Sequence, residues 1–233
     1  MCYTASIAQG AKDTFEAFTG TRWTDPLPFP HFEQLNAMAK PLIPGILMGS
    51  NRSMVPLHWL LIPPNIRTKN QASSLKIWYA NARIEELEQK PTYRNLVQTH
   101  RCILVFSAFY EWRHEGKKKV KHRVELVGSQ PMLMPGLWAQ SQLDGEIWNS
   151  CTLCTTTAQG IMRYIHNSAL RMPVIVGPQG LDQWLDPDLS LEKARQEVLK
   201  DLQTSHLVSV PPVRDTMSGD PGIEQTPIQP ELF

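Results

Sequence analysis

Short apolar runs separated by turn residues dominate the chain, and most of them are rich in β-branched and aromatic residues. Runs of this kind are typical of strands. The pattern predicts strands over residues 102–112, 120–127, 132–139, 146–156, 173–176 and 207–210. The tripeptide Glu115-Gly116-Lys117 joins the first two as a hairpin turn would. We therefore expect the strands to pair mainly antiparallel.

Helical periodicity is confined to a few short segments. The clearest covers residues 191–202, where Ser190 can cap and one face carries Leu191, Ala194, Val198 and Leu202. Shorter helices are predicted at residues 11–18, 84–89, 92–99 and 180–185. The 19 prolines, spread along the chain, keep the elements short. The predicted class is α+β, a compact β-rich fold with mainly antiparallel strands and a few short peripheral helices.

The length of 233 residues is enough for one large domain, which we place at residues 1–217. Residues 218–233 contain Pro221, Pro227 and Pro230 with little apolar periodicity, so we expect an extended tail. The formal net charge is only +1, so binding to nucleic acid would need a local basic patch.

The chain shows no sign of a membrane span or a secretory signal. No apolar stretch approaches the roughly 20 residues that cross a bilayer. We therefore expect a cytoplasmic protein, associated with the nucleoid when it binds DNA, and a monomer. The pair Cys151 and Cys154 could be a redox motif or half of a zinc site, but no second ligand pair accompanies it. We interpret both as buried structural cysteines and expect neither a metal nor a cofactor.

Cys2 is the first candidate for chemistry. Methionine is normally trimmed before a small residue, which would leave a free amine with a pKa of about 7.7–8.0 beside a thiol with a pKa of about 8.5. The amine can condense with an aldehyde, and the thiol can then close a five-membered thiazolidine ring. The alternative is an incidental small residue at the start of a strand.

Three further segments carry candidate polar residues. Asn81 can orient an amine or carbonyl and Arg83 can bind a phosphate, although both could belong to an ordinary helix cap. Glu111 lies among aromatic and small residues, where it is either a general acid/base or the cross-strand partner of a lysine. His166 precedes a predicted strand and could relay a proton, although a lone histidine there is more often structural.

Residues 113–123 concentrate positive charge in the predicted hairpin. Arg113, Lys117, Lys118 and Lys119 suit a phosphate backbone, and the neighbouring Trp112 could stack on unpaired bases. The alternative is a solvated charged turn.

Taken together, these segments resemble the SOS response-associated peptidase (SRAP) family. The resemblance lies in Met1-Cys2, Asn81-Ala82-Arg83-Ile84-Glu85, Phe109-Tyr110-Glu111-Trp112, and His166 followed by Arg171-Met172-Pro173. A segment around Trp59 partly matches the tryptophan-containing loop of the family.

The resemblance implies a protein that binds single-stranded DNA and captures abasic sites through Cys2 as a thiazolidine, with lyase-like and autoproteolytic (cysteine peptidase) character. It implies that Asn81 holds the Cys2 amine, that Glu111 assists sugar ring opening, and that His166 acts on the sugar hydroxyl. Arg83, Arg171 and Trp59 become candidate DNA contacts.

Two other functions fit parts of the sequence. An N-terminal-nucleophile hydrolase would use Cys2 on an amide with its own amine as base. A non-enzymatic reader of single-stranded or modified DNA would need only the basic patch and the aromatic residues.

Overall fold

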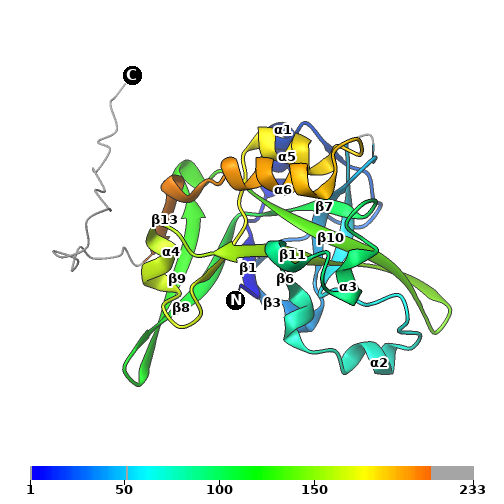
Figure 1. Cartoon of the computed structure of the whole chain (residues 1–233), viewed down its shortest axis with the longest axis horizontal. Helices are drawn as coiled ribbons and strands as arrows, with labels where there is room; N and C mark the ends of the chain where they lie inside the picture. Colours follow the sequence, from blue (N-terminus) through cyan, green and yellow to red (C-terminus); the bar gives the residue numbers. More distant parts are fainter. Residues whose placement is uncertain (1, 51, 211–233) are drawn as a thin grey trace.

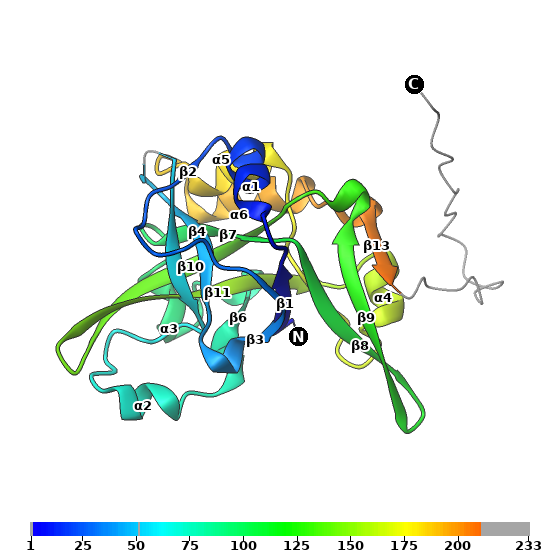
Figure 2. The ribbon, with the colours of Figure 1, turned by 180° about the vertical axis from the view of Figure 1, so that it is seen from behind.

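The computed structural model describes residues 2–50 and 52–210. Their strands form two sheets, which lie side by side in Figures 1 and 2. The smaller sheet has the order β13-β9-β8-β1-β3, and the larger has the order β12-β11-β10-β7-β4-β5-β2 with β6 paired to β11. The predicted β-rich class with mainly antiparallel strands and few short helices is confirmed.

The bounds of the elements follow in chain order. The strands are β1 (Thr4–Ile7), β2 (Arg22–Trp23), β3 (Phe32–Asn36), β4 (Leu42–Leu47), β5 (Ser53–Trp59), β6 (Asn81–Arg83), β7 (Arg101–Phe106), β8 (Ala108–Glu115), β9 (Lys118–Leu126), β10 (Met132–Leu143), β11 (Glu146–Thr157), β12 (Arg171–Pro173) and β13 (Leu207–Val210). The α-helices are α1 (Ala11–Thr19), α2 (Lys69–Ser73), α3 (Pro91–Arg94), α4 (Ile161–Ile165), α5 (Pro178–Leu185) and α6 (Leu191–Lys200). The 3-10 helices are η1 (Ala37–Ala39), η2 (Ile77–Ala80), η3 (Ile84–Glu86), η4 (Val127–Ser129) and η5 (Thr204–His206).

Five strands of the larger sheet close into a barrel. β5, β4, β7, β10 and β11 pair in sequence, and β11 then pairs with β5 in parallel, with Ser150 opposite His58. Closure leaves these strands without a free edge. The interior is apolar: Trp59 and Phe106 are fully buried, with ring centroids 5.2 Å apart. Burial of this continuous core is the main stabilising contribution to the fold.

The single strand predicted over residues 102–112 is wrong, because the chain changes sheets at Ser107. β7 belongs to the barrel, whereas β8 pairs with β1 and β9 in the smaller sheet. The backbone N–H of Ser107 donates to the carbonyl of Ser6 at 2.9 Å, and its hydroxyl accepts from the N–H of Ala8 at 2.9 Å. These bonds connect the chain to the end of β1. They depend on Ser6 and Ala8, which lie about a hundred residues earlier in the sequence.

The other strand predictions hold with small changes. β9, β11 and β13 match the predicted strands closely, while β10 continues four residues further, to Leu143. The predicted strand at 173–176 is displaced to β12, and Val176 makes only an isolated bridge with Leu133. Gly116, with a φ of 59°, takes the first turn position of the β8–β9 hairpin, as its sequence predicts.

Two predicted helices are shorter than their periodicity suggests. Residues 84–89 form only η3, because Lys90 precedes Pro91 and takes an extended conformation. The helix predicted at 92–99 is limited to α3. α1, α5 and α6 form close to the predicted places, and the Ser190 hydroxyl accepts from the N–H of Lys193 at 3.3 Å as the expected cap.

The described residues contain no helix long and apolar enough to cross a membrane. In the same part of the chain, no group of three or more His, Cys, Asp or Glu residues could hold a metal ion. Cys151 and Cys154 are free and fully buried on β11, in keeping with a structural role. The predicted tail at 218–233 lies outside the described residues.

The topology brings separate parts of the chain to the junction between the two sheets. β1 runs between β3 and β8, and the start of β1 lies near β6 in both views of Figures 1 and 2. α4 packs against β8 on the other side of the same junction. A cleft lies at this place.

Candidate functional site

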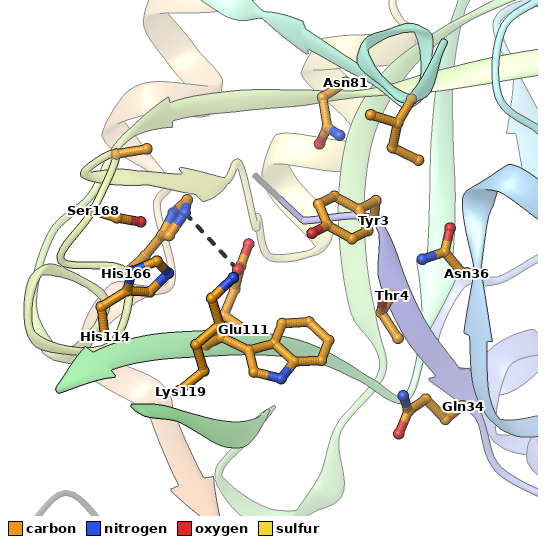
Figure 3. A pocket seen from close by; sticks show the side chains of 13 residues that line it. Tyr3, Thr4, Gln34, Asn36, Asn81, Glu111, His114, Lys119, His166 and Ser168 are labelled. Atoms are coloured by element: carbon orange, nitrogen blue, oxygen red, sulfur yellow. Dashed lines mark ion pairs between the residues drawn. The ribbon is translucent and has the colours of Figure 1, made fainter. Parts of the chain in front are cut away.

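The cleft at the sheet junction has a volume of about 700 Å³ and is open to solvent (Figure 3). Asn81, Glu111 and His166 all line it, although they are far apart in sequence. Tyr3 and Thr4, at the start of β1, form a further part of the wall. The structure thus brings three of the four predicted catalytic side chains into one space, with the fourth adjoining it.

Asn81 reaches the cleft from the short strand β6. β6 pairs in parallel with β11, with Asn81 opposite Leu153, and the hydroxyl of Tyr93 donates to the Asn81 carbonyl at 3.3 Å. The side chain is 6 % exposed, and among the described residues neither its amide nitrogen nor its amide oxygen has a hydrogen-bond partner. A buried amide without a partner costs stability. Asn81 is therefore poised to bind a ligand in the cleft.

Glu111 lies on β8 with its side chain turned toward the cleft. The alternation of the strand sends the neighbouring Tyr110 to the opposite face, where its hydroxyl donates to the Glu33 carbonyl at 2.9 Å. Glu111 is only 4 % exposed and lies opposite His122 of β9. In the register of the sheet, the residue directly across from Glu111 is therefore a histidine and not a lysine.

His166 follows the last residue of α4 and faces Glu111. Its Nε2 lies 3.9 Å from Glu111 Oε2 (Figure 3). Its Nδ1 lies 2.6 Å from the carbonyl oxygen of Arg171. A carbonyl can only accept, so Nδ1 carries a hydrogen, and Nε2 is the nitrogen that faces the carboxylate. The carboxylate and Nε2 therefore face each other at the edge of the cleft, at ion-pair distance.

Cys2 lies directly behind this wall. The antiparallel register of β1 on β8, with Ala5 opposite Phe109, directs the start of β1 toward Glu111. The Cys2 side chain is 1 % exposed. Burial raises the pKa of the Cys2 thiol well above its usual value, and the Glu111 carboxylate raises this pKa further. The thiol pKa of about 8.5 expected from the sequence is therefore too low for this environment, and the thiol is held neutral next to a carboxylate.

Two residues predicted to contact DNA make contacts within the fold. Trp59 is fully buried in the barrel and donates from its Nε1 to the Ala80 carbonyl at 3.2 Å, so it offers no face to a base. Arg171 is held in a bidentate ion pair with Glu85, at 3.1 and 2.9 Å, and it also donates to the Thr155 carbonyl. The prediction for Trp59 is corrected, because its ring is not available to a base. The DNA contact of Arg171 stays a prediction.

The predicted DNA contacts at residues 112–119 lie on or near the rim of the cleft, whereas Arg83 does not line it and pairs with Glu86 at 2.9 Å. Trp112 and Lys119 line it, and Lys117 and Lys118 are exposed at the tip of the β8–β9 hairpin. Arg113 lies over the Tyr164 ring, 3.6 Å from the ring centroid, and also pairs with Glu115 at 3.3 Å. The lysines thus form the accessible positive charge, whereas Arg113 fastens the hairpin to α4.

Sequence reasoning missed several polar residues of the cleft wall. Asn36 comes from the end of β3 and His114 from β8, where Asn167 fixes the backbone of His114 through two hydrogen bonds. Neither residue stands in a distinctive motif. Only the pairing of β3 with β1, and the folding of the 166–170 loop onto β8, brings them to the site.

Comparison with known proteins gives a consistent result. The family model described as "SOS response associated peptidase (SRAP)" matches residues 1–218. Abasic site processing protein YobE of Bacillus subtilis is 35% identical over 143 residues, covering 60% of this chain and 61% of YobE. Abasic site processing protein HMCES of Gallus gallus is 23% identical over 187 residues, covering 71% of this chain and 54% of HMCES. The aligned region thus spans about 60% of the length of the Bacillus relative.

Solved structures match over most of the chain. A protein from Bacteroides thetaiotaomicron superposes with a TM-score of 0.75 and 25% identity, covering 89% of this chain and 90% of its own. A protein from Bordetella bronchiseptica superposes with a TM-score of 0.74 at 23% identity, covering 89% and 98% respectively. These likenesses extend across both sheets and so support the fold as a whole.

Proposed function

Because this chain belongs to the SOS response associated peptidase (SRAP) family, we propose that it binds single-stranded DNA and captures abasic sites covalently through Cys2. The observation that carries the proposal is the cleft itself: Asn81, Glu111 and His166 line one space, and Cys2 lies against Glu111. The relatives named abasic site processing proteins support the same substrate.

The chemistry begins with exposure of the Cys2 amine. Hydrolysis of the Met1–Cys2 peptide bond consumes one water, releases methionine and leaves Cys2 with a free amine. We assign this step to the protein itself, with the neighbouring Glu111 as the base that activates the water.

Capture then requires the ring-opened form of the abasic sugar. His166 donates a proton to the ring oxygen as its bond to C1′ breaks, and Glu111 accepts the proton of the C1′ hydroxyl, which gives the aldehyde. One proton leaves the pair and one enters it, so the pair carries the same number of protons after the step. Such a step requires an acid and a base on the same side of the cleft, and His166 and Glu111 lie in this way.

Bond formation proceeds from nitrogen to sulfur. The Cys2 amine adds to C1′, water leaves, and the resulting imine accepts the Cys2 sulfur at the same carbon, while the thiol proton moves to nitrogen. The product is a thiazolidine, and the net change is the loss of one water. Since burial keeps the thiol neutral before attack, Glu111 acts as the carrier of its proton. The Asn81 amide oxygen, buried without a partner among the described residues, orients the amine.

The test is crosslinking to single-stranded DNA that carries one abasic site, resolved on a denaturing gel. We expect a heat-resistant shifted band that is lost in Cys2→Ala and Cys2→Ser. Equal crosslinking by these variants would remove Cys2 from the mechanism. Intact-mass measurement of the purified protein checks the loss of methionine.

The same variants separate the two competing functions. A reader of single-stranded DNA would bind as tightly after Cys2→Ala and form no covalent band in the wild type. A hydrolase would turn over small amides or peptides without DNA and form no lasting adduct. A stable band that depends on Cys2 contradicts both.

A further inference from the structure

A second histidine lies beside Glu111, on the neighbouring strand. His122 belongs to β9 and is only 3 % exposed. In the register of β8 on β9 it is the residue directly across from Glu111. His122 is not among the residues that line the cleft, so a bound sugar would contact Glu111 and not His122. Any part that His122 plays in the chemistry must therefore act through Glu111.

The inward face of β9 is apolar except at this position. Strand alternation places four side chains on the side that faces the interior: Val120, His122, Val124 and Leu126. Val124 is fully buried opposite Phe109, as packing of an apolar pair requires. The imidazole interrupts this aliphatic row at the pair in which the facing residue is a carboxylate. Packing alone does not favour a histidine there.

The register brings the two side chains within reach of each other. Directly opposed residues of an antiparallel pair have their Cβ atoms about 4.5–5.5 Å apart, which lets an imidazole N–H reach a glutamate oxygen. Glu111 is 4 % exposed, and a buried carboxylate is stable only with donors or cations around it. His166 faces the Glu111 Oε2 from the end of α4, whereas His122 approaches from β9. The carboxylate thus meets rings from two separate elements.

The cations on either side of His122 are directed elsewhere. Lys121 and Arg123 belong to the opposite face of β9, because successive side chains alternate. Lys121 lies over the Tyr110 ring, 5.2 Å from its centroid, and Arg123 pairs with a glutamate of the same strand. Among the side chains of β9, His122 is therefore the one placed to donate to Glu111.

We infer that His122 is a positioning residue, which donates a ring N–H to the Glu111 carboxylate and fixes its rotation with one oxygen toward the cleft. This inference rests on the proposed function, in which Glu111 exchanges protons with the sugar and with the Cys2 thiol. A reacting group misplaced by about 1 Å can slow a reaction by about 10²-fold. A neutral imidazole is sufficient, because one of its nitrogens carries a hydrogen.

The experiment compares replacements of His122 by the single-turnover rate of crosslinking to single-stranded DNA with one abasic site. His122→Phe keeps a planar ring and removes the N–H donor. His122→Asn and His122→Gln keep an amide N–H near the places of the two ring nitrogens. Val124→Ala, on the same face of β9, is the matched control for loosened packing. Kd is measured with DNA carrying a tetrahydrofuran residue, which has neither base nor aldehyde.

We expect His122→Phe to crosslink roughly 10–100-fold more slowly than the wild type, with Kd for tetrahydrofuran DNA changed by less than about twofold. His122→Asn or His122→Gln should recover most of the rate, according to which ring nitrogen faces Glu111. Val124→Ala should crosslink at the wild-type rate although it unfolds at lower urea. In the Glu111→Gln background, His122→Phe should change the residual rate by less than about twofold, because the carboxylate that His122 positions is gone.

Three results would overturn the inference. His122→Phe could crosslink as fast as the wild type, both amide variants could be as slow as His122→Phe, or the loss could persist in full in the Glu111→Gln background. The last two results would describe a purely structural histidine. If His122→Phe does not fold, His122→Leu takes its place, because an aliphatic side chain suits the row and also lacks a donor. Failure of the proposed function would look different, since the wild type itself would then form no Cys2-dependent band.

Discussion

The pairing of Glu111 with His166 makes a prediction that can be worked through quantitatively. If the two side chains act as acid and base in the same step, then removing either should disable that step. Glu111→Gln keeps the size of the side chain and removes its charge, and His166→Gln keeps a polar side chain and removes the titratable ring. The double variant completes a cycle.

The distance between the two groups sets the scale. Opposite unit charges 3.9 Å apart attract by about 4 kcal/mol at an effective dielectric constant of about 20, which is an upper value because the cleft admits water. General acid–base catalysis contributes about 10²–10⁴-fold to a rate. We therefore expect each single variant to crosslink abasic DNA about 10³-fold more slowly, and the double variant to be less than tenfold slower than either single one.

The assay is the single-turnover rate of band formation with excess protein, beside Kd for tetrahydrofuran DNA. DNA affinity should stay within about threefold of the wild type, since the binding surface is unchanged. In Glu111→Gln the pKa of the Cys2 thiol should fall, because one of the two causes that raise it is removed. If capture is slower although the thiol is more acidic, then the variant has lost proton transfer and not the supply of thiolate.

Two results would refute this reasoning. Multiplicative losses in the double variant would mean that Glu111 and His166 act in separate steps. Wild-type rates in Glu111→Gln would remove the carboxylate from the chemistry altogether. Urea unfolding of each variant serves as the control that the fold persists.

Three further predictions concern charge and stability. Burial raises the pKa of the thiols of Cys2, Cys102, Cys151 and Cys154, so the folded protein keeps protons that the unfolded chain releases above about pH 8.5. The free energy of unfolding should therefore be constant below that pH and fall above it by up to about 1.4 kcal/mol per pH unit for each thiol. Urea titrations from about pH 8 to about pH 10 should show that Cys151→Ala loses less stability per pH unit than the wild type. An equal loss would contradict the raised pKa of Cys151. Arg171→Ala should lower the free energy of unfolding by about 2 kcal/mol, because it removes the bidentate partner of Glu85 and the bond to the Thr155 carbonyl, and a urea midpoint equal to that of the wild type would show that this network contributes nothing. Replacing Lys117 and Lys118 by alanine should lower the salt slope of single-stranded DNA binding by about 1.4 in total, whereas Lys193→Ala on α6 should leave it unchanged; equal slopes would place DNA elsewhere on the protein.

Local chemistry explains where the sequence predictions were reliable. The Ser190 cap, the Gly116 turn and the strands β9, β11 and β13 depend on residues adjacent in the chain, so periodicity and turn composition identify them. Strands β4 and β5 were missed because Pro44 and Pro56 lie within them, directly opposite one another. Proline normally argues against a central strand. Here the two prolines face each other in the antiparallel β4–β5 pair, an arrangement that neither segment reveals alone.

Some residues of the candidate site could likewise be identified from the local sequence, whereas the exposure of others depends on the fold. Cys2, Asn81, Glu111 and His166 could be selected from the sequence, because each is a reactive or polar residue in a recognisable local motif. Trp59 and Trp78 are both tryptophans near turns, yet the first fills the barrel and the second stands in solvent. Nothing in either local sequence distinguishes them, because exposure depends on what packs against the residue from elsewhere.

The sequence by itself thus determined the fold class, the main strand pattern, the basic hairpin and the residue types able to react with an aldehyde. Only the tertiary structure decided that the chain crosses sheets at Ser107, that Arg171 pairs with Glu85, that the Cys2 thiol is buried beside a carboxylate, and that Glu111 faces His166 and lies across from His122. The physical reason is that periodicity, capping and side-chain chemistry are properties of neighbouring residues. Burial, ion pairing and pKa depend on groups that are close in the folded structure, even where they lie a hundred residues apart in the chain.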